Sequence, residues 1–295
     1  MKGLIQAADP SGALCGNAIR NALDQAYDGR RTGRWDLTQL AKAETAQIGA
    51  LIEVWLQRVL GLDDGISTSV QIGGYDIAST WSERIDGWTL DRPVPGEREI
   101  PYLVIWANEE TSRYSLGIFR PGPDSRGVSS VDRGRPRFTQ IAIDQILWVF
   151  DGCALPTNVL IKHPESAMAA VGQSSGQAAV NALFRQIQGE LVHHSAVETV
   201  AQQIDSSKRI RDARKHLRRE GIVILGHYRP QPEIAASLGL PSPRVGTFVS
   251  HRLAPMEAGE LGTGAEIDGG RWRLAVSDDP VSLAPVLPVQ GKDRS

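Results

Sequence analysis

Apolar residues follow a helical spacing over residues 180–217 and then run together in one short stretch. Ser195 with Glu198 three residues later matches a capping box, which predicts a helix over residues 196–203. Asp205 or Ser206 can cap a second helix that ends at Gly221, and residues 222–225 (IVIL) predict a buried strand. A supporting helix before them is predicted by an apolar stripe: Val180, Leu183, Phe184, Ile187 and Leu191. This order of elements is that of a winged helix-turn-helix.

The second of these helices is expected to have one apolar side and one basic side. At about 100° per residue, Ile210, Ala213 and Leu217 fall together. Four basic residues fall on nearly the opposite side: Lys208, Arg211, Lys215 and Arg218. Residues 208–219 hold seven basic residues and a single acid, although the whole chain has a net charge of −2, so this positive charge favours an element that faces phosphate. The candidate DNA-binding residues here are Ser207, Lys208, Arg209, Arg211, Arg214, Lys215, Arg218 and Arg219.

The first part of the chain mixes helical and strand patterns. Residues 18–27 and 37–60 predict helices, residues 67–72 and 75–81 a hairpin around Gly73 and Gly74, and residues 141–149 a further helix. Two more strands are predicted at residues 102–106 and 114–119. The Pro- and Gly-rich residues 121–137, with Arg126, Arg133, Arg135 and Arg137, are expected to form a solvated loop, with a DNA clasp as the alternative. The fold class is therefore α+β.

Residues 166–176 are rich in Gly, Ser and other small residues, and this composition predicts a division of the chain into two domains. We expect a first domain over residues 1–165, a linker over 166–176 and a second domain over 177–295. No apolar run reaches eighteen residues and none near the start resembles a signal peptide, so we expect a cytoplasmic protein without a membrane partner. Cys15 and Cys153 stand alone, without the spacing of a zinc site or a disulfide framework.

Several segments, in one order along the chain, closely resemble the NaeI family of restriction endonucleases. In the first part these are residues 24–35 (DQAYDGRRTGRW), 49–53 and 103–107. In the second part they are residues 176–189, 199–203, 220–227 (EGIVILGH), 238–244, 279–280 and 284–286. The resemblance implies an endonuclease domain of the PD-(D/E)xK type, a second domain with a CAP-like helix-turn-helix, and a homodimer on palindromic double-stranded DNA. The arginines of residues 24–35 are candidate contacts to the DNA backbone: Arg30, Arg31 and Arg34.

The resemblance also locates a nuclease site, at which this chain departs from the family. Such a site holds Mg²⁺ with carboxylates and uses a Lys beside the scissile phosphate. Glu53 keeps the family's Glu, whereas Ser69, Ala78 and Thr80 stand where an Asp, a second Asp and the Lys are expected. Asp76 shares a strand face with Ala78, but two residues displace a carboxylate by roughly 6.5 Å, beyond the roughly 2.0–2.1 Å of a Mg²⁺ bond.

These substitutions lead to a hypothesis and an alternative. The hypothesis is a sequence-specific DNA-binding protein of the bacterial nucleoid, without a nuclease activity or a cofactor, that regulates transcription or reads modified DNA. The alternative is a working Mg²⁺-dependent type II restriction endonuclease whose site is rearranged around Glu53 and Asp76. Cleavage of DNA in the presence of a divalent metal discriminates between them.

Overall fold

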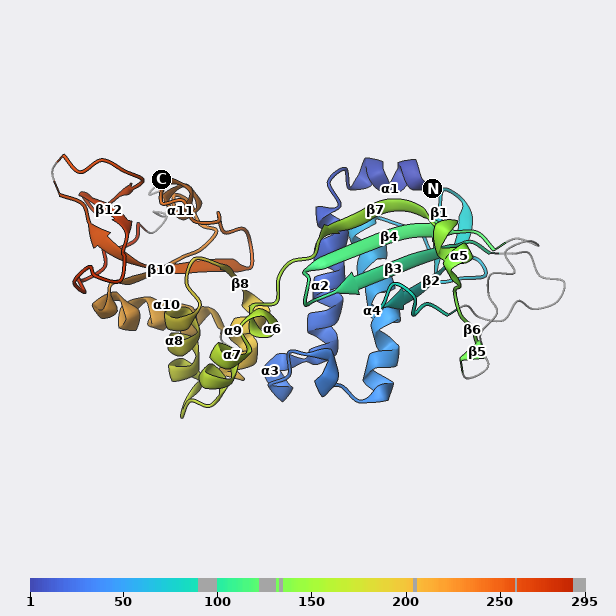
Figure 1. Cartoon of the computed structure of the whole chain (residues 1–295), viewed down its shortest axis with the longest axis horizontal. Coiled ribbons are helices and arrows are strands. Elements are labelled where there is room, and N and C mark those ends of the chain that lie inside the picture. Colours follow the sequence, from blue (N-terminus) through green and yellow to red (C-terminus); the bar gives the residue numbers. More distant parts are fainter. Residues whose placement is uncertain (90–99, 122–130, 133–134, 204–205, 258, 289–295) are drawn as a thin grey trace, which may run out of the picture. The chain divides into compact units, whose positions relative to one another are not determined.

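The computed structural model describes residues 1–89, 100–121, 131–132, 135–203, 206–257 and 259–288. The chain folds into two units (Figure 1). The first unit consists of residues 1–27 and 37–157, and the second of residues 28–36 and 158–295. The chain therefore passes between the units three times, because the short segment of residues 28–36 belongs to the second unit.

The first unit is built on a five-stranded sheet with the order β1-β2-β3-β4-β7. β2 and β3 are parallel, and the other neighbouring strands are antiparallel. The strands are β1 (Val70–Ile72), β2 (Tyr75–Ser82), β3 (Tyr102–Asn108), β4 (Arg113–Phe119) and β7 (Leu147–Ala154). A further pair of short strands consists of β5 (Val131–Asp132) and β6 (Arg135–Pro136). Mixed sheet and helices confirm the α+β class.

Each face of this sheet has its own apolar core. The helices α2 (Ala13–Tyr27) and α4 (Lys42–Leu60) pack on one face, where Ile19, Ile52 and Ile105 are fully buried. Trp88, Val104 and Phe119 form the core of the opposite face. The remaining helices of the unit are α1 (Lys2–Ala8), η1 (Leu37–Gln39) and α5 (Gln140–Asp144).

The prediction of a helix over residues 141–149 was only partly right. α5 ends at Asp144, and residues 147–154 form the edge strand β7. Trp148, Val149 and Phe150 are aromatic or β-branched, and β7 pairs along β4, so sheet packing outweighs the helical spacing of the short apolar run.

The second unit consists of a helical layer followed by a small sheet. Its helices are α3 (Gly29–Thr32), α6 (Val159–Lys162), α7 (Pro164–Val171), α8 (Gly176–Gln186), α9 (His194–Ala201), α10 (Ser206–Leu217), η2 (Arg218–Glu220) and α11 (Gln231–Ser237). Its strands are β8 (Leu191–His193), β9 (Ile222–Leu225), β10 (Thr247–Pro255), β11 (Ala265–Ile267) and β12 (Gly270–Leu274). They form a sheet with the order β11-β12-β10-β8, in which β9 also pairs with β10. No helix of the described residues is long and apolar enough to cross a membrane.

Two expectations about this region are corrected. Most of the predicted linker, residues 166–176, is helical: α7 runs to Val171, starts with a proline at its first turn, and buries Ala167 and Ala170. The expected capping box is also absent, since α9 begins at His194 and the hydroxyl of Ser195 contacts the imidazole Nδ1 of His193 at 2.9 Å. The position of Asp205, a predicted cap of α10, lies outside the described residues.

Candidate nucleic-acid interface and nuclease site

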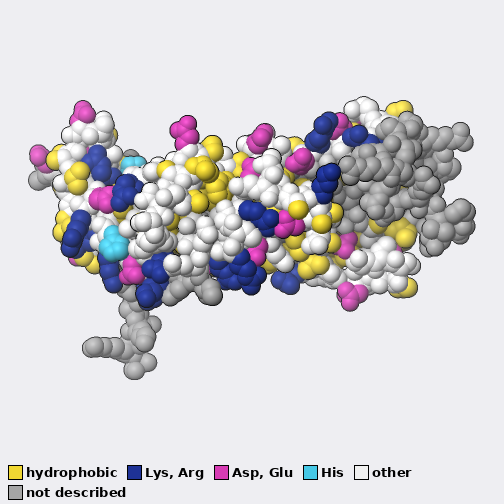
Figure 2. Space-filling view, turned by 90° about the horizontal axis from the view of Figure 1, so that it is seen from below, with side chains coloured by type: hydrophobic (Ala, Val, Ile, Leu, Met, Phe, Trp, Pro, Cys, Tyr) yellow, Lys and Arg dark blue, Asp and Glu magenta, His cyan; other side chains and the backbone are white. Residues whose placement is uncertain are grey.

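α10 presents a basic face to solvent. The exposed residues of α10 are Ser207, Lys208, Arg211, Lys215 and His216, and Arg219 of η2 continues this face, while Ile210, Ala213 and Leu217 are buried in the core of the second unit. Figure 2 shows Lys and Arg side chains on this unit, at the left of the view. The amphipathic pattern of the sequence is thus realised, with Arg219 taking the exposed place expected for Arg218.

Three of the candidate DNA-binding residues are engaged in the fold. Arg214 donates from Nε to the carbonyl oxygen of Ile224 at 2.8 Å and from Nη2 to Oε1 of Gln231 at 3.2 Å. Burial lowers the pKa of Arg214 below its ordinary value. Arg218 donates from Nε to the carbonyl oxygen of Ala284 at 2.8 Å. Arg209 has a buried Nε, and Gln177 of α8 donates to its carbonyl oxygen at 3.0 Å.

The inward position of Arg214 has a signal in the sequence. Arg214 stands four residues after Ile210 and three before Leu217, a spacing that places all three residues on one side of a helix. The expected DNA contact of Arg214 therefore conflicts with the apolar stripe of its own helix.

The segment of residues 28–36 is an integral part of the second unit, although the sequence suggested the first. Trp35 is only 9% exposed and belongs to the same apolar core as Ile210 and Leu217. A Cβ on Gly29 would collide with the hydroxyl of Thr199 on α9 and would lie 2.7 Å from the carbonyl oxygen of Arg34. Only a glycine allows this close approach of α3 to α9.

This packing brings α3 to the turn between α9 and α10. A Cβ on Gly33, at the end of α3, would lie 2.9 Å from the side chain of Gln202, which follows α9 directly. Arg31 is 71% exposed, and its ion pair with Asp28 is long, at 3.3 Å. Arg30 and Arg34 are half-buried. The described part of the unit thus places the arginines of residues 28–36 beside the helices that precede the basic face.

The residues at the expected nuclease positions are divided between two faces of β2. Glu53 on α4 accepts a hydrogen bond from the hydroxyl of Ser79, and both side chains are half-buried on the helix-covered face. Ala78 and Thr80 alternate with Ser79 and point to the opposite face, where Thr80 donates to the carbonyl oxygen of Thr89 at 3.1 Å. Ser69 is exposed just before β1. The structure therefore separates Glu53 from the two strand positions that the resemblance grouped with it.

The carboxylate of Asp76 is hydrogen-bonded to the backbone of a neighbouring turn. Its two carboxylate oxygens accept hydrogen bonds from the backbone N–H groups of Ile66 and Ser67, each at 2.8 Å. These two hydrogen bonds lower the pKa of Asp76. The carboxylate therefore stays charged and holds the turn that precedes β1.

The described residues do not fit the expected magnesium site. Among them, no group of three or more His, Cys, Asp or Glu side chains is arranged to hold a metal ion. Glu53 and Asp76 each serve another contact, and Ala78 and Thr80 offer no carboxylate. We therefore derive no catalytic step through a metal ion.

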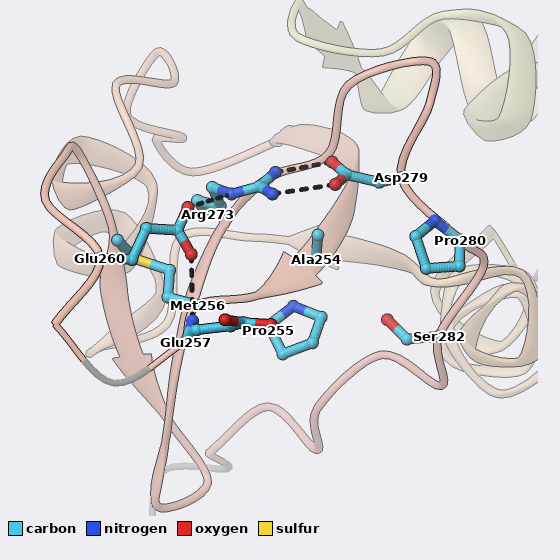
Figure 3. Close-up of a pocket in the computed structure, with 9 residues that line it drawn as sticks. All are labelled: Ala254, Pro255, Met256, Glu257, Glu260, Arg273, Asp279, Pro280 and Ser282. Atoms are coloured by element: carbon cyan, nitrogen blue, oxygen red, sulfur yellow. Dashed lines mark hydrogen bonds and ion pairs between the residues drawn. The ribbon is translucent and has the colours of Figure 1, made fainter.

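The second unit also contains a cleft of about 490 Å³ that the sequence did not reveal. Figure 3 shows Arg273 between two carboxylates, with its guanidinium paired bidentately to Asp279 at 2.6 and 2.8 Å and to Glu260 at 2.7 Å. Arg273 and the backbone N–H of Val276 lower the pKa of Asp279 to about 2. Because this cation is matched by two acids, the cluster braces β12 against the turns on either side.

Comparison with known proteins identifies the family. A family model described as restriction endonuclease NaeI matches residues 2–283. The chain belongs to the NaeI family of restriction endonucleases. It is 38% identical to the type II restriction enzyme NaeI of Lentzea aerocolonigenes over 300 aligned positions, which cover 98% of this chain and 93% of that protein. The resemblance drawn from the sequence segments is thereby confirmed.

The same comparison overturns the hypothesis of a regulator with a lost nuclease centre. The similarity to a restriction enzyme spans both units, and the mismatch with the expected magnesium site does not by itself demonstrate a loss of activity. Three substitutions at motif positions were given too much weight, since a site can be assembled from residues that a motif does not include. The interpretations as a pseudoenzyme and as a transcription regulator are therefore wrong.

Proposed function

We propose that this protein is a type II restriction endonuclease that binds and cuts double-stranded DNA. The observation that carries the proposal is the 38% identity to a restriction enzyme along 98% of the chain. The similarity includes the first unit, with Glu53 and β2, and the second unit, with the basic face of α10. A DNA-binding role alone would require only the latter.

The second unit is the proposed DNA-binding part. α9, a turn and α10 form a helix-turn-helix arrangement in this proposal, and the N-terminal part of such a second helix meets base edges in the major groove. Ser207, Lys208 and Arg211 are the proposed base contacts, whereas Lys215 and Arg219 lie further along the exposed face and suit contacts to phosphate. Arg31 of α3 is an additional proposed phosphate contact, supported by its exposure and by the packing of its segment beside the turn.

The wing of the proposed motif departs from a simple hairpin. β9 and β10 pair in an antiparallel manner after α10, but the chain between them includes α11. In this proposal β9 and β10 serve as the wing strands, and residues 226–246 take the place of the short wing loop.

A homodimer on a palindromic site is a further proposal. A closed two-fold assembly presents the same α10 to each half-site, which matches the symmetry of a palindrome. Light scattering of the full chain with and without duplex tests it, and a monomer bound to one half-site would contradict it.

Cleavage is the decisive test of the enzymatic proposal. Purified protein is incubated with plasmid DNA and either Mg²⁺ or Mn²⁺, and we expect discrete double-strand breaks. Glu53 is the acid that remains at a family position, so Glu53→Gln should reduce the rate by about 10²–10³-fold. Glu110→Gln, an exposed acid of the same unit, is the matched control. The absence of breaks with either metal would refute the proposal. Equal cleavage rates for Glu53→Gln and the control would show that Glu53 is not part of the nuclease site.

The variant Asp76→Asn tests whether the charge of Asp76 takes part in DNA cleavage. Because Asp76 holds the turn of Ile66 and Ser67, its amide variant keeps one acceptor oxygen and loses the charge. A fall in rate without a change in thermal stability would place the charge of Asp76 in the reaction. If the cleavage rate and the thermal stability fall together, Asp76 serves only to hold the turn.

A further inference from the structure

A second cavity of the second unit lies beside α10, and Lys215 of the basic face is among the residues that line it. It has a volume of about 300 Å³, within the range of small-ligand sites. One side is lined by Arg214, Lys215 and Arg218 of α10 and η2. The other sides come from β9 and from the C-terminal residues 285–287. The cavity thus joins a cationic wall to an apolar one.

Arg214 gives this cavity an uncompensated charge. Its guanidinium donates two hydrogen bonds to uncharged acceptors, the carbonyl oxygen of Ile224 and the amide oxygen of Gln231. No carboxylate among the described residues forms an ion pair with it, and burial alone accounts for its lowered pKa. Arg214 is half-buried, and a partly desolvated charge without a counter-charge is unfavourable, so an anion that enters the cavity would recover electrostatic energy.

The neighbouring cations point to the same kind of ligand. Arg218 uses Nε for the carbonyl oxygen of Ala284, which leaves the rest of its guanidinium for another acceptor. The nearest carboxylate oxygen of Lys215 is that of Asp212 at 3.7 Å, a long and exposed contact. Three cations therefore share one cavity, and its lining includes no acid among the residues that the structure describes. The cleft of Figure 3 differs, since two carboxylates already neutralise its arginine.

We propose that this cavity binds a phosphate group. Two guanidinium groups and an ammonium group provide the charge-assisted donors that phosphate oxygens accept, and Pro285, Val286 and Leu287 leave an apolar surface for what the phosphate is attached to. The phosphate can come from the backbone of a bound duplex or from a free nucleotide. The first source rests on the proposed DNA-binding function, and the second is independent of it.

The first experiment uses the full chain and no DNA. Inorganic phosphate and thymidine monophosphate are titrated into the protein, and binding is followed by calorimetry and by the shift in melting temperature. Arg218→Gln and Lys215→Gln should each weaken binding about tenfold or more, since each removes one charged donor. Arg271→Gln, an exposed arginine of β12 in the same unit, should bind as the wild type does. An equal loss in Arg271→Gln would mean general charge attraction and would overturn the site.

The second experiment separates the two sources of phosphate. If the duplex backbone fills the cavity, DNA displaces thymidine monophosphate, and Arg218→Gln lowers the salt dependence of DNA binding by about one phosphate contact for all sequences. If the cavity takes a free nucleotide, DNA and nucleotide bind together and the salt dependence is unchanged. Nucleotide binding without any DNA binding would support the site and refute the proposed function. Neither nucleotide binding nor an effect of Arg218→Gln on DNA affinity would overturn the phosphate site.

Discussion

Each unit of this protein withdraws an arginine from solvent, fully in the case of Arg20 and partly in the case of Arg214, and the charges of the two are balanced differently. In the first unit, Arg20 is 2% exposed and pairs with Asp24 at 2.6 Å and with Glu109, which also accepts a hydrogen bond from Tyr27. In the second unit, Arg214 meets only uncharged acceptors. Burial by itself lowers the pKa of both; in Arg20 the two carboxylates more than reverse this effect and raise its pKa, whereas in Arg214 the lowering remains.

The cluster around Arg20 is structural, whereas the surroundings of Arg214 form a candidate ligand site. A buried cation with its own carboxylates is complete within the fold, and its removal leaves acids stranded. A half-buried cation without carboxylate partners, such as Arg214 at the side of a cavity, retains an affinity for an anion from outside. We therefore expect mutation to affect stability in the first unit and ligand binding in the second.

The largest expected effect is on the stability of the first unit. Arg20→Met leaves Asp24 and Glu109 without their cation and should lower the free energy of unfolding by about 3–5 kcal/mol. Arg214→Met should cost only about 1–2 kcal/mol, because the loss of two hydrogen bonds is partly offset by the removal of a desolvated charge. Urea unfolding with hydrogen exchange of β3 and β9 as local readouts measures both variants.

Arg84→Met is the control for this pair, since Arg84 is 70% exposed in its ion pair with Asp86 and its replacement should leave the free energy of unfolding nearly unchanged. If Arg214→Met proves as destabilising as Arg20→Met, the distinction between the two arginines is wrong.

A similar loss of stability is expected in the second unit from a residue that lies far from it in sequence. Trp35→Ala should lower the free energy of unfolding by about 3–5 kcal/mol, because it empties a core position beside Ile210 and Leu217. Hydrogen exchange should rise in α8, α9 and α10 and stay unchanged in β3. If hydrogen exchange rises only in the first unit, residues 28–36 pack with the first unit and the assignment to the second unit is wrong.

A smaller and different effect is expected on the exposed face of α10. Arg211→Ala should weaken binding to a specific duplex by about 1–3 kcal/mol and relax the preference at one base pair, without a change in stability. Arg229→Ala, an exposed arginine beyond β9, is the control. Fluorescence anisotropy with matched and single-mismatch duplexes measures both, and an unchanged mismatch penalty would exclude Arg211 as a base contact.

The smallest expected effect is the acid sensitivity of the balanced cluster in the second unit. The pKa of Asp279 lies at about 2 in the folded chain, against an ordinary 3.8. Because the folded pKa is the lower one, the contribution of Asp279 is fully present above about pH 4 and is lost as the pH falls toward 2. Asp279→Asn should therefore reduce the dependence of unfolding on pH in this window by up to one proton, compared with the exposed neighbour variant Asp278→Asn. Identical pH profiles for the two variants would contradict the role assigned to Arg273.

Local patterns in the sequence were sufficient for α10 and for several strands. The alternation of apolar and charged positions along α10 reflects a contact that every turn of the helix repeats, so Lys208, Arg211 and Lys215 could be assigned to the solvent side. The family could also be recognised from ordered segments. Arg214 was misassigned because its basic character was considered without its place in the apolar stripe.

The residues at the nuclease positions could be located in the sequence, but the sequence did not predict which of them lie together in the folded chain. β2 was predicted within a residue, and strand alternation already separated Ser79 from Ala78 and Thr80. The face of β2 that α4 covers depends on the packing of distant elements. The hydrogen bond between Glu53 and Ser79 joins residues 26 positions apart, and no local spacing predicts it.

The sequence by itself determined most of the element types, the basic face and the family, because these depend on periodicity and on segments that are each continuous. Only the tertiary structure decided that residues 28–36 complete the second unit, that Glu53 faces Ser79, and that Arg214 is half-buried at the side of a cavity. Each of these depends on which apolar surfaces meet. Many pairings of helices and sheets satisfy the same local pattern, and close packing of the whole chain selects one of them.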